Sequence, residues 1–573
     1  MTQGERSFLK AAFHGVVAEE LLAEFPQLPE EQAPEVARML EVLETLAEQG
    51  TQPEPKLDGE LPEGWLEAVA EAGIFGTLIP TEHGGLGLGR LADARVHEAL
   101  GRLDPALAIT VGAHSGLAAT ALTRAGTDSQ RARLLPALAR GERLAAFALT
   151  EPGMGSDAAA TETLAQLATD GGGYELNGHK IWVTNGGRAD VFVVFARTTR
   201  SDTDRKPALT AFLVERAPGV EVGPEITKVG VRGASTTSLR LDAARVPADA
   251  LLGALGRGFK VAVEALNEGR IQVAARCLGV ARRALERATE RALSRHAFGR
   301  PLAGFQMIQE RLAEQAAQVY ALESMCTMTA GLADTGMPDY SLESAACKVF
   351  GSETALAVTD AALRIAAGVG YVEGQGWERA VRDARADLLL EGTNEVMRAF
   401  IALSGMRSPG AEMEAVERAM REPIKGFGVL SDFALSRARA VLGRERLSVA
   451  HALLKREAVH LEEAISSLGS AADRLLRRYG SAIAEEQMIL GRVADAAIQI
   501  WALAATLSRT TAALNRRGEG GAARELSLAA NFGAIAHRRI QHALSHLDDE
   551  TDALRVHVAD ELCRAGGRLP PLP

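Results

Sequence analysis

The feature that most constrains the fold of this chain is a block of short β-prone runs set between two long helical stretches. The runs are rich in Val, Phe, Leu and Thr and are separated by Gly, Asn, Asp and Pro, as is typical of strands joined by turns. They fall at 174–178, 191–195, 209–214 and 239–241. We therefore predict a small β-barrel or sandwich in the middle of a mainly α protein.

On both sides of this block, apolar residues recur at spacings of three and four, as they do on one face of an α-helix. Val36, Leu40, Leu43 and Leu46 are an example. A chain of 573 residues is too long for one hydrophobic core, so we expect several domains. The pattern predicts an α-helical domain at 1–144, the β-barrel domain at 145–254, an α-helical bundle at 255–410 and an appended α-helical domain at 411–573.

Charge and cysteine content exclude several classes of function. Lys and Arg number 63 against 74 Asp and Glu, a net charge of −11, which argues against a nucleic-acid partner bound through its phosphates. The four cysteines show no C-x-x-C spacing, so we expect no disulfide framework, no metal site and a cytoplasmic location. The segment 7–17 lacks a signal-peptide cleavage pattern. The sequence contains no uninterrupted run of about 18 apolar residues, so we predict no transmembrane helix.

The densest local motif is AFALTEPGMGSD at 146–157. An apolar run ends there in a turn containing Gly153 and Gly155, and successive amides in such a turn can bind an anion. Further along, WVTNGG places Trp182 and Thr184 on a second strand, where a flat face and a short donor suit a heteroaromatic ring. The alternative is a strand, a glycine-rich hairpin and a core tryptophan.

Together, LTEPGMGSD and WVTNGG resemble the flavin-binding signature of the acyl-CoA dehydrogenase family. In that family the two segments hold FAD against a fatty acyl thioester. The resemblance implies an FAD site, with Ser156 also near the substrate. The cofactor-binding residues that it implies in this region are Phe147, Leu149, Thr150, Gly155, Ser156, Trp182, Val183 and Thr184.

Two more segments would contribute to the same cofactor. SRHAFGRPLAGFQMIQ resembles a loop that reaches over FAD from a second subunit, which implies cofactor contacts for Arg295, Phe298 and Gln306; the alternative is that its arginines are solvated cations. RIAAGVGYVEGQGWERAVRD aligns with a family segment that normally begins with Gln and carries a Gly-Gly pair. Arg364 and Ala367 replace the Gln and the first Gly, whereas Gly368 remains. The FAD contact of this segment is therefore open, although Arg364 could bind a phosphate.

Removing two hydrogens from an acyl thioester requires a base for the α-proton and a hydride acceptor, and no protein side chain accepts hydride. Glu391 in ADLLLEGTNEVMR is our candidate base, because burial among Leu388 to Leu390 would raise its pKa. The alternative is a carboxylate that stabilises a helix start.

The segment LEGTNEVMRAFIAL closely resembles the family's base-bearing segment, which implies Glu391 as catalytic base and Gly392 beside the thioester. It also implies that the Glu391 amide and a ribityl hydroxyl of FAD polarise the thioester carbonyl, with Thr393 and Glu395 near FAD. Some relatives carry their base where this chain has Gly269, which cannot serve and which would leave room for a long acyl chain. The implied substrate-binding residues are Ser156, Asn267, Gly269, Arg270 and Gly392.

The chain continues beyond residue 410 with a strongly helical segment, in which Leu490, Val493, Ala497 and Ile500 begin an apolar seam that continues to Leu514. We expect 462–476, 523–544 and 551–563 to pack on it. Such an appended domain resembles that of the very-long-chain members of the family and their complex I assembly relative, which implies a homodimer. The stretch 429–446 mixes apolar residues with arginines and could lie on a membrane surface, or be a linker helix packed on its own bundle.

We therefore expect a cytoplasmic, FAD-dependent enzyme, with peripheral membrane contact as an alternative. It would convert long-chain acyl-CoA to trans-2-enoyl-CoA in fatty acid β-oxidation and pass electrons to an electron-transfer flavoprotein. Two other functions stay open at this point: an acyl-CoA oxidase that uses oxygen, and a catalytically weak scaffold protein of the same fold.

Overall fold

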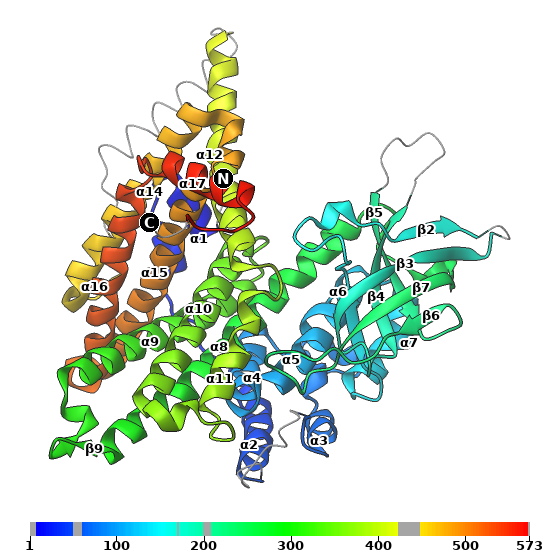
Figure 1. The fold of residues 1–573 in the computed structure, drawn as a ribbon, viewed down its shortest axis with the longest axis horizontal. Coiled ribbons are helices and arrows are strands. Elements are labelled where there is room, and N and C mark those ends of the chain that lie inside the picture. Colours follow the sequence, from blue (N-terminus) through cyan, green and yellow to red (C-terminus); the bar gives the residue numbers. More distant parts are fainter. Residues whose placement is uncertain (1–6, 50–59, 169–170, 199–207, 422–446, 571–573) are drawn as a thin grey trace.

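The computed structural model describes residues 7–49, 60–168, 171–198, 208–421 and 447–570. Helices fill one side of the molecule and a β-sheet lies on the other (Figure 1). The basic stretch 429–446 lies outside the described residues. From residue 33 to the sheet the chain forms α2 (Ala33–Gln49), α3 (Trp65–Glu71), α4 (Arg90–Leu103), α5 (Pro105–Gly112), a π-helical turn (Ala113–Ala119), α6 (Thr120–Ala125) and α7 (Asp128–Ala139).

The middle domain is one mixed eight-stranded sheet with the order β6-β7-β3-β2-β4-β5-β8, and β1 pairs in parallel with β4. Alternate residues of β4 face two different cores: Val191, Val193 and Phe195 meet the helices, while Phe192 and Val194 fill the interior of the domain. The strands are β1 (Ala145–Ala148), β2 (Leu164–Leu167), β3 (Gly173–Thr184), β4 (Val191–Thr198), β5 (Ala208–Glu215), β6 (Val220–Val222), β7 (Thr236–Pro247) and β8 (Leu251–Leu252). The predicted α–β–α order is confirmed.

Helix α8 (Gly258–Ser294) is the axis of the helical half, because it packs against α4 on one side and against α10 on the other. Every residue from Glu268 to Ala281 is buried, so both faces of this segment lie inside the protein. The other helices of this bundle are α9 (Gln306–Asp334), α10 (Ser341–Ala366), α11 (Trp377–Ala384) and α12 (Asn394–Arg421), and a small hairpin of β9 (His296–Ala297) and β10 (Arg300–Pro301) joins α8 to α9.

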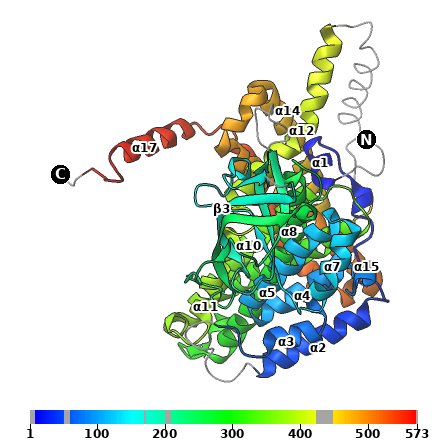
Figure 2. The same cartoon turned by 90° about the vertical axis from the view of Figure 1, so that its right-hand side faces the viewer.

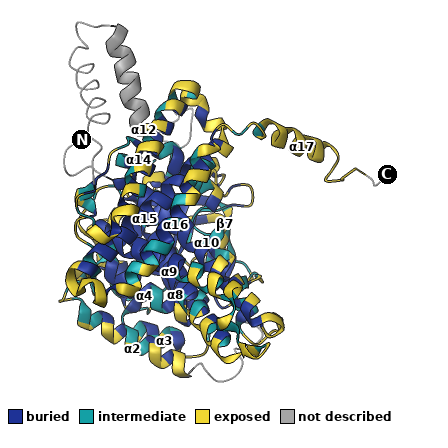
Figure 3. Ribbon diagram, turned by 90° about the vertical axis from the view of Figure 1, so that its left-hand side faces the viewer, coloured by how far each residue is buried: buried dark blue, intermediate teal, exposed yellow. Residues whose placement is uncertain are grey.

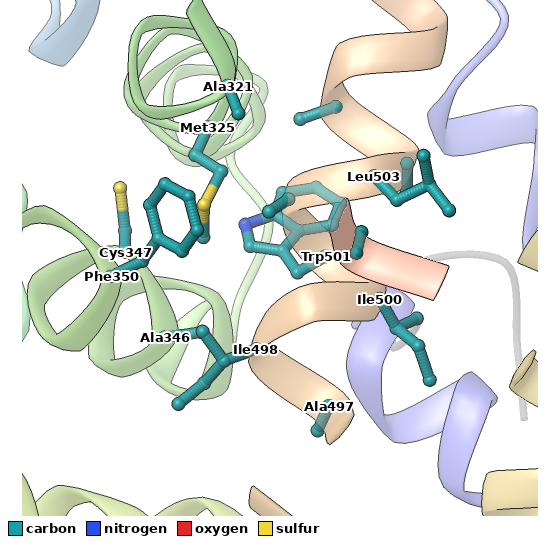
Figure 4. Close-up of a cluster of buried hydrophobic side chains, with 14 of the residues drawn as sticks. Ala321, Met325, Ala346, Cys347, Phe350, Ala497, Ile498, Ile500, Trp501 and Leu503 are labelled. Atoms are coloured by element: carbon teal, nitrogen blue, oxygen red, sulfur yellow. The ribbon is translucent and has the colours of Figure 1, made fainter. Parts of the chain in front are cut away.

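The appended segment forms α14 (Lys455–Tyr479), α15 (Gln487–Gly521) and α16 (Ala523–Ser545). The predicted seam on α15 is confirmed, because its apolar positions from Leu490 to Leu514 are buried. Trp501 lies at its centre, fully buried between α9 and α10 beside Met325 and Phe350 (Figure 4), and its indole N–H donates to Thr329 Oγ1 at 3.1 Å. The appended helices and the bundle thus share one core.

Helix α1 (Phe8–Phe13) packs against the C-terminal helices α12, α14 and α15 rather than against α2 to α7. The rings of Phe8 and Trp501 lie 5.2 Å apart, centre to centre. The hydroxyl of Ser7 and the amide of Leu9 both donate to the Glu343 carboxylate, at 2.6 Å and 3.0 Å. The beginning of the chain is therefore part of the core that the appended domain builds.

Helix α17 (Asp552–Arg564) corrects one expectation. The segment 551–563 does form a helix, but none of its residues is buried, and the helix projects away from the body (Figures 2 and 3). Two of its apolar side chains, Leu554 and Val558, are more than half exposed, so the helix does not pack on the seam.

Two stretches are long and apolar enough to cross a membrane by length and composition alone. They are Pro105–Ala125 and Gln487–Gly521, and 89% and 72% of their most apolar windows lie buried inside the protein. Core helices of soluble proteins pass the same test, so the finding is weak evidence for a span.

Replacing Trp501 by Ala should lower the free energy of unfolding by about 3–5 kcal/mol, because the change removes a large buried ring and leaves a cavity. Denaturant unfolding followed by circular dichroism measures the loss. Leu554→Ala on the exposed helix α17 is the matched control and should stay within about 0.5 kcal/mol of the wild type. Equal unfolding curves for the two variants would show that the α15 seam does not carry stability.

Candidate active site

Glu391 lies on a tight turn between a short 3₁₀ turn (Ala386–Leu388) and helix α12. Its φ is +57°, a left-handed value that non-glycine residues rarely adopt, and Gly392 follows at +96°. A left-handed non-glycine residue costs about 1–3 kcal/mol, so contacts around the turn must hold it in place. Thr393 and Glu395 continue from this turn into α12, where the Val396 amide donates to Thr393 Oγ1 at 3.3 Å and Glu395 is exposed.

The carboxyl of Glu391 points inward. Its Oε2 atom is buried and has no hydrogen-bond partner among the residues that the structure describes. A Cβ atom added to Gly269 would lie 2.2 Å from this oxygen and 2.7 Å from Leu117 Cδ2. The room that Gly269 leaves is therefore taken by the Glu391 carboxyl, whereas the sequence predicted room for an acyl chain.

Burial raises the pKa of Glu391 above its ordinary value. The cations of Arg276, Arg270 and Lys348 oppose this rise, and the carboxylate of Asp387 adds to it. A carboxylate with a raised pKa is a stronger base, so the electrostatics of the turn suit proton abstraction.

The leucines before Glu391 contribute less to its burial than the sequence predicted. Leu389 is 65% exposed, because the turn directs it outward. Leu390 instead packs on the middle domain, beside Val231 and Ala234. Two positions after Ala234, Thr236 of β7 pairs with Thr184 of β3. The base turn therefore lies close to the strand that carries Trp182.

Arg270 is 6% exposed and follows Gly269 on α8. Its Nη1 atom donates to Asn267 Oδ1 at 3.0 Å, and its guanidinium lies 5.5 Å from the centre of the Phe400 ring. Burial lowers the pKa of Arg270 to about 10, although Glu391 raises it. Within the described residues its Nε has no partner. A buried cation with an unused donor beside a base is suited to bind a polar group of a substrate.

Two further buried cations that the sequence analysis missed support the base turn. Arg276 on α8 donates to Asp387 Oδ1 at 2.5 Å and 2.9 Å. Lys348 on α10 is fully buried and donates to the Gly392 carbonyl at 2.7 Å. A signal for both exists in the sequence, because each is a lone charge within an apolar helical run, VAARCLGVA and SAACKVF.

Trp182 lies on the surface of the sheet, 58% exposed, so the alternative of a core tryptophan is wrong. Its φ of +56° falls where the β3–β7 register shifts between Lys180 and Val183, and such bulges turn side chains in a new direction. Thr184 is partly exposed, whereas Val183 is 1% exposed and points into the sheet interior. Only the backbone of Val183 can therefore reach a ligand.

The loop 150–157 rests on a buried ion pair that sequence reasoning also missed. Lys180 Nζ lies 2.7 Å from Glu151 Oε1, and Thr163 donates to the same oxygen from its hydroxyl and its amide. Burial alone would raise the pKa of Glu151, but the bonds from Lys180 and Thr163 hold it below its ordinary value, while burial lowers the pKa of Lys180 to about 8. Gly155 and Ser156 are exposed at the end of the loop, so their amides are accessible.

The side chains of Phe147 and Leu149 pack against the core between the sheet and the helices, and Phe147 lies 4.8 Å from the ring of Phe195. Both predicted cofactor contacts would therefore involve mainly their backbone. Thr150, the next residue, is partly exposed, and its carbonyl accepts from the Ile181 amide at 2.9 Å. This bond joins the loop to the Trp182 strand.

The structure does not bring Arg295, Phe298 and Gln306 to the sheet of the same chain. They lie on the β9–β10 hairpin and the start of α9, at the far end of the helical half (Figure 1). Phe298 is 95% exposed and borders a largely apolar hollow of about 380 Å³ that Arg364 also lines. Gly368 is exposed nearby on the turn after α10. These residues form a second group, separate from Trp182 and Glu391.

The comparisons with known proteins cover almost the whole chain. Models of the acyl-CoA dehydrogenase N-terminal, middle and C-terminal domains match residues 30–142, 146–244 and 256–406, and the ACAD9/ACADV C-terminal domain matches 452–567. The very long-chain specific acyl-CoA dehydrogenase of Macaca fascicularis is 36% identical over 95% of this chain and 85% of that protein. This chain belongs to the acyl-CoA dehydrogenase family. A probable acyl-CoA dehydrogenase of Bacillus subtilis is 34% identical over 86% of this chain and 83% of that protein.

Solved structures agree with this acyl-CoA dehydrogenase fold. An acyl-CoA dehydrogenase from Bacillus anthracis, complexed with FAD, matches with a TM-score of 0.79 at 29% identity, over 98% of this chain and 96% of that one. Butyryl-CoA dehydrogenase from Megasphaera elsdenii matches with a TM-score of 0.63 at 34% identity, over 67% of this chain and all of that one. The predicted fold class, with its appended helical domain, is thereby confirmed.

Replacing Ala367 by Gly should stabilise this acyl-CoA dehydrogenase by about 1 kcal/mol. Ala367 ends α10 with a φ of +56° and a ψ of −133°, a conformation that glycine adopts without strain. Thermal unfolding measures the gain. Ala357→Gly, at an exposed position within the same helix, should instead cost about 1 kcal/mol, and a loss in both variants would contradict the strain at position 367.

Replacing Lys180 by Met should cost about 3–5 kcal/mol, because it leaves the Glu151 carboxylate buried without its cation. The double variant Lys180→Met/Glu151→Gln should be more stable than the single one, since it removes both charges. Denaturant unfolding of the two single variants and the double variant gives the coupling energy. Strictly additive losses would show that the pair does not support the loop.

Proposed function

We propose that this acyl-CoA dehydrogenase oxidises long-chain acyl-CoA to trans-2-enoyl-CoA, with Glu391 as the base. The observation that carries the proposal is the Oε2 atom of Glu391, which is buried against Gly269 and has no hydrogen-bond partner among the described residues. Burial also raises the pKa of this carboxyl group. The unused donor of Arg270 nearby provides a place for a polar group of the thioester substrate.

The residues present fit an FAD cofactor. Trp182 offers an exposed flat face on the side of the sheet next to the base turn, and the loop 150–157 presents accessible amides at Gly155 and Ser156. When bound, FAD supplies the acceptor for the β-hydride, which no side chain can be. Thr150, Trp182 and Thr184 would hold it in one subunit, and the Arg295, Phe298, Gln306 and Arg364 group in the other.

In this mechanism Glu391 removes the α-proton of the acyl group, and its own amide N–H polarises the thioester carbonyl. Arg270 stays charged at neutral pH, so it stabilises the ionised form of Glu391 and the enolate-like charge that develops on the substrate. Packing of Leu117 beside Gly269 and the Glu391 carboxyl helps to exclude water from this oxygen.

The long-chain preference, the role in fatty acid β-oxidation and the electron acceptor rest on the relatives. The appended domain matches the ACAD9/ACADV C-terminal domain, and the Macaca relative is described as very long-chain specific. A structure described as the electron transferring flavoprotein of Acidaminococcus fermentans includes a chain that matches with a TM-score of 0.62 at 35% identity. We therefore propose an electron-transfer flavoprotein as acceptor; peroxide release under air would instead indicate an acyl-CoA oxidase.

We further propose that the enzyme is a homodimer. The Phe298 group lies far from the sheet of its own chain, and exposed Phe298 and Met307, 95% and 80%, border the apolar hollow there. A second copy would cover this surface and complete the cofactor site. The cytoplasmic location and the peripheral membrane contact stay predictions.

Replacing Glu391 by Gln should abolish turnover and leave FAD bound, because the amide fills the same space but cannot accept the α-proton. Gly269→Ala should lower kcat by about 100-fold, since its Cβ would displace the carboxyl. The rate and extent of flavin bleaching after anaerobic mixing with acyl-CoAs of increasing chain length measure both effects and the chain-length preference. Full bleaching in Glu391→Gln would place the base elsewhere.

A further inference from the structure

The ammonium of Lys348 encloses the turn that carries Glu391. It donates to the Gly392 carbonyl at 2.7 Å, to Asn394 Oδ1 at 2.8 Å and to the Leu388 carbonyl at 3.4 Å. Leu388 precedes Glu391 by three residues, whereas Gly392 and Asn394 follow it. All three N–H donors of the ammonium are thus used. Their acceptors lie before and after Glu391 in the chain, and Glu391 itself is not bonded to the ammonium.

We propose that Lys348 is a positioning residue for the catalytic base: its bonds close the turn around Glu391 and fix the direction of the carboxyl. This inference rests on the proposed role of Glu391. It gives α10, which also carries Arg364 of the proposed FAD group, a second part in the site.

The backbone of the turn explains why it needs such a support. Glu391 and Gly392 both have left-handed φ values, which a non-glycine residue such as Glu391 adopts only under strain. The bond from the Lys348 ammonium to the Gly392 carbonyl is charge-assisted and therefore stronger than a bond between neutral groups. Without it, the turn would be free to relax to an extended conformation and carry the carboxyl away from Gly269.

A second layer fixes the Asn394 end of the enclosure. The Asn394 amide donates to Ser352 Oγ at 3.0 Å and to Glu353 Oε1 at 3.2 Å, both on α10 one turn beyond Lys348. The Asn394 side chain is therefore held with its oxygen toward the ammonium. Helix α10 thus provides a rigid frame for the turn.

Lys348 acts on the base through its charge as well as through its hydrogen bonds. Its three bonds go to neutral oxygens, and no carboxylate among the described residues forms an ion pair with it. Asp387, the acid nearby, is already paired with Arg276. Lys348 consequently opposes the rise that burial causes in the pKa of Glu391 and so favours the ionised form of the base.

The fall of activity at alkaline pH provides a second test of the role of Lys348. Burial lowers the pKa of Lys348 to about 8, against the attraction of Asp387, Glu391 and Cys277, with Arg276 adding to the lowering. Glu395 on α12 is a further acid within its field. Above pH 8 the neutral amine has two N–H donors for three acceptors, so the enclosure loses one bond. Activity should therefore fall as pH rises through about 8.

Lys348→Met tests the inference, because Met keeps the unbranched shape and removes the charge and the donors. The holoenzyme should show a kcat about 10- to 100-fold lower with KM changed by less than about threefold, since the base is misplaced while the acyl-CoA contacts remain. The acid limb of kcat/KM should move to higher pH, because Glu391 loses a stabilising cation. Flavin absorbance after gel filtration checks that FAD stays bound.

Glu343→Gln is the matched control. Glu343 is buried on the same helix, but it bonds to Ser7 and Leu9 of the N-terminal segment and not to the base turn. This variant should lower the unfolding temperature and leave the pH profile at its wild-type position. Lys348→Arg retains the charge at high pH, so its alkaline limb should move upward; this variant decides the question if Lys348→Met does not fold.

A Lys348→Met enzyme with the wild-type pH profile, or with a kcat loss no larger than that of Glu343→Gln, would overturn the inference. So would an unchanged alkaline limb in Lys348→Arg. If Glu391→Gln retains turnover, the assignment of the base fails; if Glu391→Gln is inactive while Lys348→Met behaves as the wild type, only the inference on Lys348 fails.

Discussion

The site depends on the close approach of the Glu391 carboxyl to the backbone of α8 at Gly269. A side chain at this position would meet the carboxyl at 2.2 Å, so the acid can enter the protein only because α8 has no Cβ there. The low dielectric of that position raises the pKa of the acid, and three buried cations limit the rise. Burial strengthens the base, and the cations favour its ionised form.

Much of this arrangement could be predicted from the sequence. The helical periodicity, the β-prone block and the seam from Leu490 to Leu514 follow from where apolar residues fall along the chain, and the structure confirms each. Glu391 and Trp182 lie in long, specific motifs, and the resemblance to the family also implied Arg270. The family resemblance supplied what periodicity could not, namely which of many carboxylates is the candidate base.

The remaining features could not be predicted because they depend on contacts between residues far apart in the sequence. Lys348 comes near the Glu391 turn, and Lys180 pairs with Glu151, only when their helices or strands pack, whereas the sequence shows each residue as one more charge. Orientation was also beyond the sequence: the bulge in β3 exposes Trp182, and the left-handed turn directs Leu389 outward. Helix α17 was expected to pack on the α15 seam, yet none of its residues is buried, and its first residue, Asp552, meets α15 through an ion pair with Arg492.

The contact between Phe8 and Trp501 has a consequence for synthesis of the protein. The ribosome synthesises α1 hundreds of residues before α15, the helix that covers it. The phenylalanines of α1 therefore stay exposed to water, or pack on a temporary neighbour, until translation is nearly complete. Maturation of the N-terminal segment is thus a late step although it is made first. A message truncated before α15 would leave both the bundle and the leading helix with an uncovered apolar face.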